Sequence, residues 1–363
     1  FATGATAAAL ENHSPEYIAA VSRLWDNMIG KRMFITGGVG AVHFDEKFGP
    51  DYFLPTDAYL ETCAAVGAGF FSQRMNELTG DAKYMDELER TLYNNVLTGI
   101  SLSGTQYTYQ NPLNSAKHAR WSWHDCPCCP PMFLKMMSAM PGFIYSQKGS
   151  DVYVNLFVGS ETEMTLADRN RVRLTQKTGY PWEGVVTMTV EPEKEKTFIL
   201  KVRIPGWAQG VENPYGLYRS EVRSAVSLKV NGKSVPLKIF KGYAEIQRKW
   251  KKGDQVELTL PVQPRLVTAN EAVVDLQDKV AIAAGPFVYC LEGCDNEGLA
   301  DLKVDMRSPL SITFEKGLLN GINVIKGQAL DKTGKKVPVT AIPYYALGNR
   351  QDKGYAVWIP ASK

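Results

Sequence analysis

The stretch Val152-Tyr153-Val154-Asn155-Leu156-Phe157-Val158 is the point at which this chain changes its periodicity. Before Gly149 the apolar residues recur at helical spacing, whereas strand-like runs follow at 185–190 and 198–204. Many short strands separated by tight turns favour β-sandwiches over βαβ units. The chain is therefore expected to be α+β, with a helical part followed by a β-rich part.

Turn signals divide the β-rich part further. Asn231-Gly232 is typical of a two-residue β-hairpin, and Lys252-Gly253-Asp254 marks another turn before a strand. Pro264 precedes two more strand-like runs at 280–284 and 287–291. The expected domains are residues 1–146, 147–264 and 265–363.

The helical part carries clear start signals. Ser14-Pro15 combines a capping residue with a proline at the first helical position. The apolar stripe that follows comprises Val21, Leu24, Trp25 and Met28. Further helices are expected from just after Pro55 to Gly80, over 82–98, and from Pro130-Pro131 to Pro141. The methionines of the last helix are interpreted as core residues.

Composition excludes several classes of partner. The 363 residues are 44% hydrophobic and 22% charged, which is ordinary for a globular protein. A net charge of +3 without a basic run gives no indication of nucleic-acid binding, and no apolar stretch is long enough to span a membrane. Because the first residue is Phe1, the chain is expected to be a mature form or a fragment.

Two short segments contain four of the six cysteines and one carboxylate, namely Glu61-Thr62-Cys63 and Cys126-Pro127-Cys128-Cys129-Pro130-Pro131. Zinc accepts thiolate and carboxylate ligands, so three cysteines and a glutamate could bind one ion, and a thiolate is also a nucleophile. Disulfides or buried unliganded thiols are the alternatives. Cys290 and Cys294 lie far along the chain and are interpreted as structural.

Motifs along nearly the whole chain carry a family resemblance. They are the two cysteine segments together with Leu24-Trp25-Asp26-Asn27, Gly37-Gly38-Val39-Gly40, Leu54-Pro55, Arg203-Ile204-Pro205-Gly206-Trp207, Gly285-Pro286-Phe287-Val288-Tyr289-Cys290 and Ile342-Pro343-Tyr344-Tyr345. In this order they resemble family 127 glycoside hydrolases, which are bacterial retaining β-L-arabinofuranosidases and their relatives. The resemblance implies an (α/α)6 barrel, whose first half this chain lacks, followed by two β-sandwich (jelly-roll-like) domains.

The resemblance also implies roles for individual residues. Glu61, Cys63, Cys128 and Cys129 match the zinc ligands. Cys128 matches the nucleophile, which forms a glycosyl-thioether, and Glu46 matches the general acid/base. Tyr109, in Tyr109-Gln110-Asn111-Pro112-Leu113, matches an active-site tyrosine that contacts the substrate.

Two local features leave alternatives open. Residues two apart do not share a helix face, so either the chain is irregular between Glu61 and Cys63, or one of them only supports the other. Asp45 is a second candidate acid beside Glu46, because the local sequence His43-Phe44-Asp45-Glu46 departs from the family's usual His-Gly-Glu.

Histidines and tryptophans near these motifs are further candidates. His43 is a candidate for binding a sugar hydroxyl, whereas His118 is interpreted as structural and His124 as a possible support for the zinc ligands. Trp121 and Trp123 could stack on a sugar or belong to the core.

The resulting hypothesis is a zinc-dependent glycosidase that releases terminal β-L-arabinofuranose or a related sugar from an oligo- or polysaccharide. Its location would be the cytoplasm or periplasm of a bacterium, and a homodimer is a possible assembly. The alternatives are an inactive carbohydrate-binding or structural relative, a family member acting on a different plant-polysaccharide sugar, and a thiol redox protein.

Overall fold

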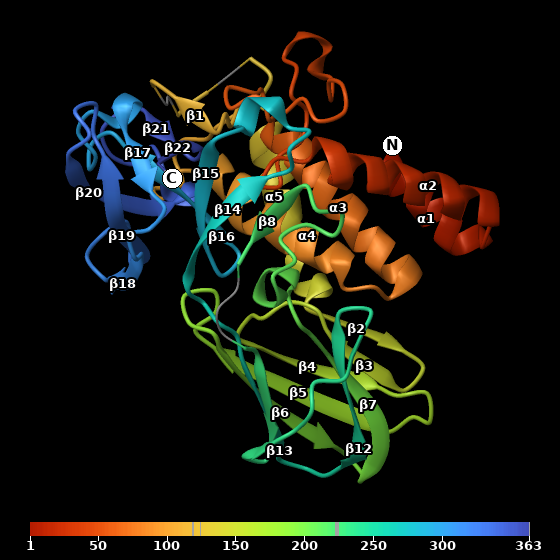
Figure 1. Cartoon of the computed structure of the whole chain (residues 1–363). Coiled ribbons are helices and arrows are strands. Elements are labelled where there is room, and N and C mark those ends of the chain that lie inside the picture. The colour runs from red at the N-terminus through yellow and green to blue at the C-terminus, as the bar shows by residue number, and fades with distance from the viewer. Residues whose placement is uncertain (118–119, 124, 222–224, 363) are drawn as a thin grey trace.

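A computed structural model describes residues 1–117, 120–123, 125–221 and 225–362. Figure 1 shows three regions: a group of helices at the N-terminal end, a β-sandwich below it, and the C-terminal strands beside it. Strands β14, β15 and β16 run between the helices and the rest of the C-terminal strands. The chain is thus a mixed α and β protein of several regions, as its periodicity predicts.

Five α-helices are present in the described residues: α1 (Ala2–Asn12), α2 (Pro15–Asn27), α3 (Thr62–Thr79), α4 (Lys83–Thr91) and α5 (Cys129–Ala139). Short helical turns extend three of them, namely η1 (Met28–Arg32), η3 (Leu92–Val96) with η4 (Leu97–Gly99), and η5 (Met140–Phe143). None of the helices in the described ranges is both long and apolar enough to cross a membrane.

Helix α2 begins as predicted. Ser14 caps it, because its hydroxyl accepts a hydrogen bond from the backbone N–H of Tyr17, and Pro15 occupies the first helical position. Trp25 is fully buried and donates its indole N–H to Ser72 of α3 at 3.0 Å. The expected stripe is wrong at Leu24, which is 50% exposed and therefore lies on the outer face.

Helix α3 begins at Thr62, seven residues after Pro55 and therefore later than expected. Leu60 has a left-handed backbone with φ +47°, which a right-handed helix cannot include. The residues before it form turns, and the helix starts only at Thr62 and ends, as expected, at Gly80 with φ +63°. This irregular approach decides where Glu61 points.

The region below the helices is a sandwich of two sheets. The first contains β4 (Ser160–Thr165), β5 (Arg171–Thr178), β6 (Val185–Pro192), β9 (Ser227–Val230), β10 (Lys233–Ser234) and β13 (Asp254–Thr259). The second contains β2 (Tyr145–Lys148), β3 (Asp151–Val154), β7 (Lys196–Arg203), β11 (Ile239–Phe240) and β12 (Tyr243–Trp250). One apolar cluster, including Leu200 and Val256, joins their inner faces. The expected hairpin is confirmed, since Asn231 and Gly232 both have positive φ between β9 and β10.

The remaining strands form one extended sheet. They are β1 (Asn114–Ser115), β8 (Tyr218–Ser220), β14 (Pro264–Ala269), β15 (Lys279–Ala284), β16 (Phe287–Glu292), β17 (Lys303–Asp305), β18 (Ser311–Glu315), β19 (Ile322–Leu330), β20 (Lys336–Pro343), β21 (Tyr355–Ala356) and β22 (Ile359–Ser362).

The structure differs here from the expected second sandwich of two separate sheets. Strand β15 pairs with β16 at one end and with β22 at the other, so the pairings β16–β20–β19–β17–β22–β15 close into a ring. An apolar cluster that includes Ile282, Tyr289 and Ile325 fills the ring. Hydrophobic alternation predicts each strand's buried face but not which edges meet.

Buried charges join the helices to the sandwich. Arg203, at the end of β7, is 0% exposed and forms ion pairs with Asp86 at 2.6 Å and Glu89 at 2.5 Å, both on α4. Its Nε donates to the backbone oxygen of Asn155. A charge removed from water in this way is tolerated only while its partners are in place.

We therefore expect Arg203→Met to lower the free energy of unfolding by about 3 kcal/mol or more, since it leaves the buried Glu89 and the partly buried Asp86 without their cation. Arg171→Met is the matched control, because Arg171 is 55% exposed and its pairs with Glu163 and Glu193 lie at the surface. It should cost less than about 1 kcal/mol. Urea unfolding of both variants measures the difference, and equal losses would contradict this account of the junction.

Candidate metal and catalytic site

Two helices direct their N-terminal ends at one cluster of side chains. Glu61 is the N-cap residue of α3 and Cys63 lies in its first turn, while Cys128 and Cys129 are the N-cap and first residue of α5. Neither N-cap side chain accepts a capping hydrogen bond from the backbone of its own helix, so both remain available to the cluster. The positive ends of the two helix dipoles favour negative charge here.

The spacing of Glu61 and Cys63 is resolved by the irregular chain before α3. Glu61 has an extended backbone, with φ −62° and ψ 138°, so its side chain is not bound to helical spacing. A β-bridge with Gln110 holds it against the segment that carries Tyr109. The side chains of Glu61 and Cys63 can therefore reach the same cluster although the two residues are two positions apart in the sequence.

Asn111 fixes the two segments together. Its buried side-chain amide donates to the backbone oxygen of Leu60 and to Thr62 Oγ1, both at 2.9 Å. Its amide oxygen accepts from Thr108 Oγ1 at 2.9 Å, and Thr62 Oγ1 donates to the backbone oxygen of Thr108. The approach to α3 and the segment before Tyr109 are therefore joined by side-chain hydrogen bonds.

The four side chains converge closely. The sulfur of Cys63 lies 3.1 Å from that of Cys128 and 3.5 Å from that of Cys129, and Cys128 and Cys129 are 3.8 Å apart. A carboxylate oxygen of Glu61 lies 3.4 Å from Cys128 and 4.0 Å from Cys129. All four ligand atoms lie within 4.8 Å of one another.

Burial and proximity disfavour the charged forms of three of these groups. Burial raises the pKa of the Glu61 carboxyl, and it raises the pKa of the Cys128 thiol to about 12. The adjacent thiol of Cys129, together with burial, raises the pKa of Cys63 well above its ordinary value. Several anions at this spacing would repel one another, and a bound cation would remove that penalty.

The donor set fits a metal ion. A tetrahedral ion with sulfur ligands at about 2.3 Å places the sulfurs roughly 3.8 Å apart. The longest sulfur–sulfur separation matches this value, and the other two, at 3.1 Å and 3.5 Å, are shorter. Three sulfurs and one carboxylate also complete a four-ligand set. The cluster is therefore consistent with a metal site.

Glu46 and Asp45 point to different partners. Both are exposed residues with left-handed backbones, at φ +49° and +55°, in a short loop closed by a bridge between Val42 and Lys47. The Asp45 carboxylate pairs with Lys47 at 2.8 Å. Glu46 Oε1 instead accepts hydrogen bonds from Tyr59 at 3.3 Å and Tyr109 at 3.5 Å.

The hydroxyl of Tyr109 lies between the carboxylate and the cluster. It is 3.5 Å from Glu46 Oε1 and 3.6 Å from the sulfur of Cys128. The distance between Glu46 Oε1 and the sulfur of Cys128 therefore cannot exceed the sum of these two distances. Retaining glycosidases hold their two catalytic groups about 5–5.5 Å apart, which lies within that limit.

Aromatic residues surround this arrangement. The ring of His43 contacts that of Tyr59 edge-on at 4.7 Å, and Trp121 packs partly buried against Tyr109 at 5.9 Å. Burial raises the pKa of both tyrosine hydroxyls, so each remains a hydrogen-bond donor at neutral pH. Trp123 is 72% exposed.

Other candidates lie outside the cluster or outside the described residues. Cys126 is exposed, and the cluster does not include it. Cys290 is buried in β16, and Cys294 contacts Glu292 at 3.7 Å. His118 and His124 fall outside the described residues, so their interpretations stay predictions.

Sequence reasoning missed two residues of this site. Tyr59 carried no signal, because it lies in a turn region that was predicted to be helix. Asn111 stood within a recognised motif, but an asparagine between polar and proline residues is ordinary loop composition.

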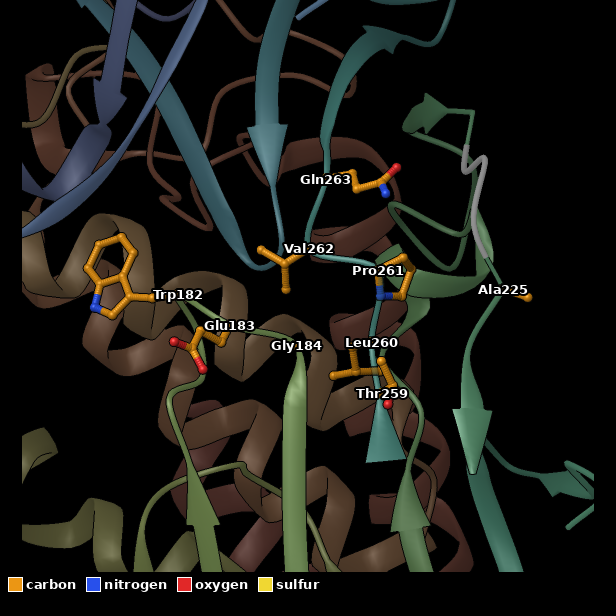
Figure 2. Close-up of a pocket in the computed structure, with 9 residues that line it drawn as sticks. All are labelled: Trp182, Glu183, Gly184, Ala225, Thr259, Leu260, Pro261, Val262 and Gln263. Carbon is orange, nitrogen blue, oxygen red and sulfur yellow. The ribbon is translucent and has the colours of Figure 1, made fainter. Parts of the chain in front are cut away.

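Two cavities in the described part of the chain lie elsewhere. One, of about 360 Å³, is lined by Trp182, Glu183, Gly184, Ala225, Thr259, Leu260, Pro261, Val262 and Gln263. Figure 2 shows that it lies where the turn before β6 meets the connection that follows β13. The other, of about 800 Å³, lies between β8, β14 and the β17–β18 connection. Neither is lined by a residue of the cysteine cluster, so the candidate site rests on its converging side chains.

Three family models match consecutive parts of the chain. They are the GH127 catalytic domain of beta-L-arabinofuranosidase over residues 2–142, the GH127 middle domain over 151–262, and the glycoside hydrolase family 127 C-terminal domain over 264–360. A curated relative, the non-reducing end beta-L-arabinofuranosidase of Bifidobacterium longum subsp. longum, is 28% identical over 92% of this chain.

Solved structures agree with these matches. A GH127 beta-arabinofuranosidase is 38% identical with a TM-score of 0.94, and a GH127 beta-L-arabinofuranosidase from Geobacillus stearothermophilus T6 is 36% identical with a TM-score of 0.92. Each comparison covers 99% of this chain. The chain spans 59% of each solved structure and 54% of the curated relative. Since the three models follow one another along almost its whole length, the chain belongs to glycoside hydrolase family 127.

Proposed function

We propose that this chain carries the catalytic groups of a retaining glycoside hydrolase that releases terminal β-L-arabinofuranose or a related sugar. The observation that carries this proposal is the placement of Glu46 and Cys128 on either side of the Tyr109 hydroxyl. A retaining mechanism needs a nucleophile and an acid/base group about 5–5.5 Å apart. The sugar is taken from the names of the arabinofuranosidases that the chain resembles.

Cys128 is the proposed nucleophile and also a metal ligand. Zinc is the proposed metal, held by Glu61, Cys63, Cys128 and Cys129, because it favours sulfur together with a carboxylate oxygen. When bound, zinc lowers the pKa of its thiol ligands, so that a thiolate exists at neutral pH. The Cys128 sulfur then attacks the anomeric carbon while the bond from that carbon to the leaving oxygen breaks.

Glu46 is the proposed acid/base. In the first step its carboxylic acid gives a proton to the leaving oxygen, and in the second its carboxylate takes a proton from the attacking water. Water adds to the anomeric carbon as the carbon–sulfur bond breaks, which returns the thiolate. Asp45 is less suited, because its carboxylate is paired with Lys47.

The remaining assignments complete the proposal. Tyr109 and His43 are expected to contact the sugar, which would come from an oligo- or polysaccharide. The helices would belong to an (α/α)6 barrel, with domains at 1–146, 147–264 and 265–363. A homodimer is the proposed assembly.

Metal analysis tests the zinc site. The full-length protein, purified under reducing and chelator-free conditions, should contain about one zinc per chain. Cys63→Ser should lose most of it, because a hydroxyl is a weak zinc ligand. Cys126→Ser should retain it, since Cys126 lies outside the cluster. Wild-type protein without metal would contradict the zinc assignment.

Substitution of the nucleophile tests the covalent step. Cys128→Ser should abolish release of the sugar from an aryl β-L-arabinofuranoside, because a hydroxyl is a far poorer nucleophile than a thiolate. Cys126→Ser should keep most of the activity. Mass spectrometry of the wild type with a slow substrate should find the sugar attached to Cys128. Comparable turnover by Cys128→Ser and wild type would exclude the thiolate mechanism.

Chemical rescue distinguishes the two candidate acids. With an activated aryl glycoside, Glu46→Gln should form the covalent intermediate but release the sugar slowly, because no base activates water. Azide, which needs no base, should partly restore turnover and give a glycosyl azide of retained configuration. Asp45→Asn should need no rescue. Rescue of Asp45→Asn alone would assign the role to Asp45.

A further inference from the structure

Tyr59 lies where the loop of Glu46 meets the segment of Tyr109. Its side chain is 8% exposed, and its hydroxyl donates to Glu46 Oε1 at 3.3 Å. This is shorter than the 3.5 Å bond from Tyr109, whose hydroxyl also accepts from the Cys128 thiol. The contact from Tyr59 is therefore the closer of the two.

The backbone of Tyr59 is held on both sides. Its N–H donates to the backbone oxygen of Ala41 at 3.2 Å, and its own backbone oxygen accepts from the N–H of Asn111, also at 3.2 Å. Ala41 precedes the loop that carries Glu46, and Asn111 is the residue that joins the Tyr109 segment to α3. The backbone of Tyr59 is thus held against both the loop that carries Glu46 and the segment that carries Tyr109.

Glu46 needs such a support. It is exposed, and it follows another left-handed residue in a loop whose backbone is held by the Val42–Lys47 bridge and by a hydrogen bond from the Glu46 N–H to the backbone oxygen of His43. An exposed glutamate side chain has several rotamers, and only some of them direct the carboxylate toward Cys128. A hydroxyl on a buried side chain with a fixed backbone favours the rotamers that bring Glu46 Oε1 within its reach.

We propose that Tyr59 is a positioning residue for the acid/base Glu46, which it holds toward the sulfur of Cys128 by a hydrogen bond to Oε1. This inference rests on the proposed glycosidase function. The ring of His43, packed edge-on against Tyr59, restricts the tyrosine ring in turn. Tyr59 acts only through Glu46 and need not touch the sugar.

Kinetics of Tyr59→Phe in the full-length enzyme test the proposal. The change keeps the ring and its packing but removes the donor. With a substrate whose leaving group needs protonation, kcat should fall about ten- to a hundredfold, the rate equivalent of one hydrogen bond to a charged group, while KM changes little. Tyr107→Phe is the matched control, because Tyr107 is 4% exposed in the same aromatic cluster and its hydroxyl makes no hydrogen bond in the described structure.

A double substitution separates positioning from a general structural effect. In a Glu46→Gln background, measured with an activated substrate and azide, Tyr59→Phe should cause no further loss, since its effect passes through the carboxylate. An additional loss as large as in the wild-type background would overturn the proposal, as would unchanged kcat in the single variant. If the wild type hydrolyses no glycoside at all, the proposed function fails instead; an active wild type with an unaffected Tyr59→Phe refutes the positioning role alone.

Discussion

The region around the cysteines depends on one electrostatic constraint. Glu61, Cys63, Cys128 and Cys129 bring four groups that can each become an anion within 4.8 Å of one another. Two helix N-termini contribute only partial positive charge, while burial and the neighbouring groups raise the pKa values of Glu61, Cys63 and Cys128 above their ordinary values. A bound cation would offset this penalty and favour the thiolate forms of Cys63 and Cys128. The convergence of the N-terminal ends of α3 and α5 is consistent with binding such an ion.

The C-terminal strands contribute to the same site by fixing its loops. The hydroxyl of Tyr344 donates to the backbone oxygens of Asn111 and Pro112, and Thr98 donates to the backbone oxygen of Tyr344. One apolar cluster includes Leu60 and Leu113 of the helical part together with residues of the C-terminal sheet. The segments that carry Glu61 and Tyr109 are thus packed against β structure more than a hundred residues away in sequence. This packing explains how segments without regular secondary structure can hold the side chains of Glu61 and Tyr109 in defined positions.

Sequence predicted the elements whose signals are local. The Ser14-Pro15 cap, the Asn231-Gly232 hairpin and the glycine end of α3 all depend on neighbouring residues, and each is found. The start of α3 was misjudged because the left-handed turn at Leu60 follows from tertiary hydrogen bonds to Gly40 and Asn111 and not from an intrinsic preference of leucine. The closed strand ring and the role of Tyr59 were missed for the same reason, since both depend on contacts between distant segments. The ligand set came from family resemblance, and its spacing alone left the positions of Glu61 and Cys63 open.

Access for a sugar, as well as charge, favours Cys128 over Cys129 as the proposed nucleophile. Cys129 is 0% exposed, so a sugar ring cannot approach its sulfur without displacing the core around it. Cys128 is only partly buried and contacts the Tyr109 hydroxyl, which also reaches Glu46. A metal-bound sulfur is a weaker nucleophile than a free thiolate, but the same stabilisation makes it a better leaving group when water attacks the anomeric carbon. A cysteine in this position can therefore serve both steps of a retaining reaction, provided that one nearby carboxylate changes its protonation state between them.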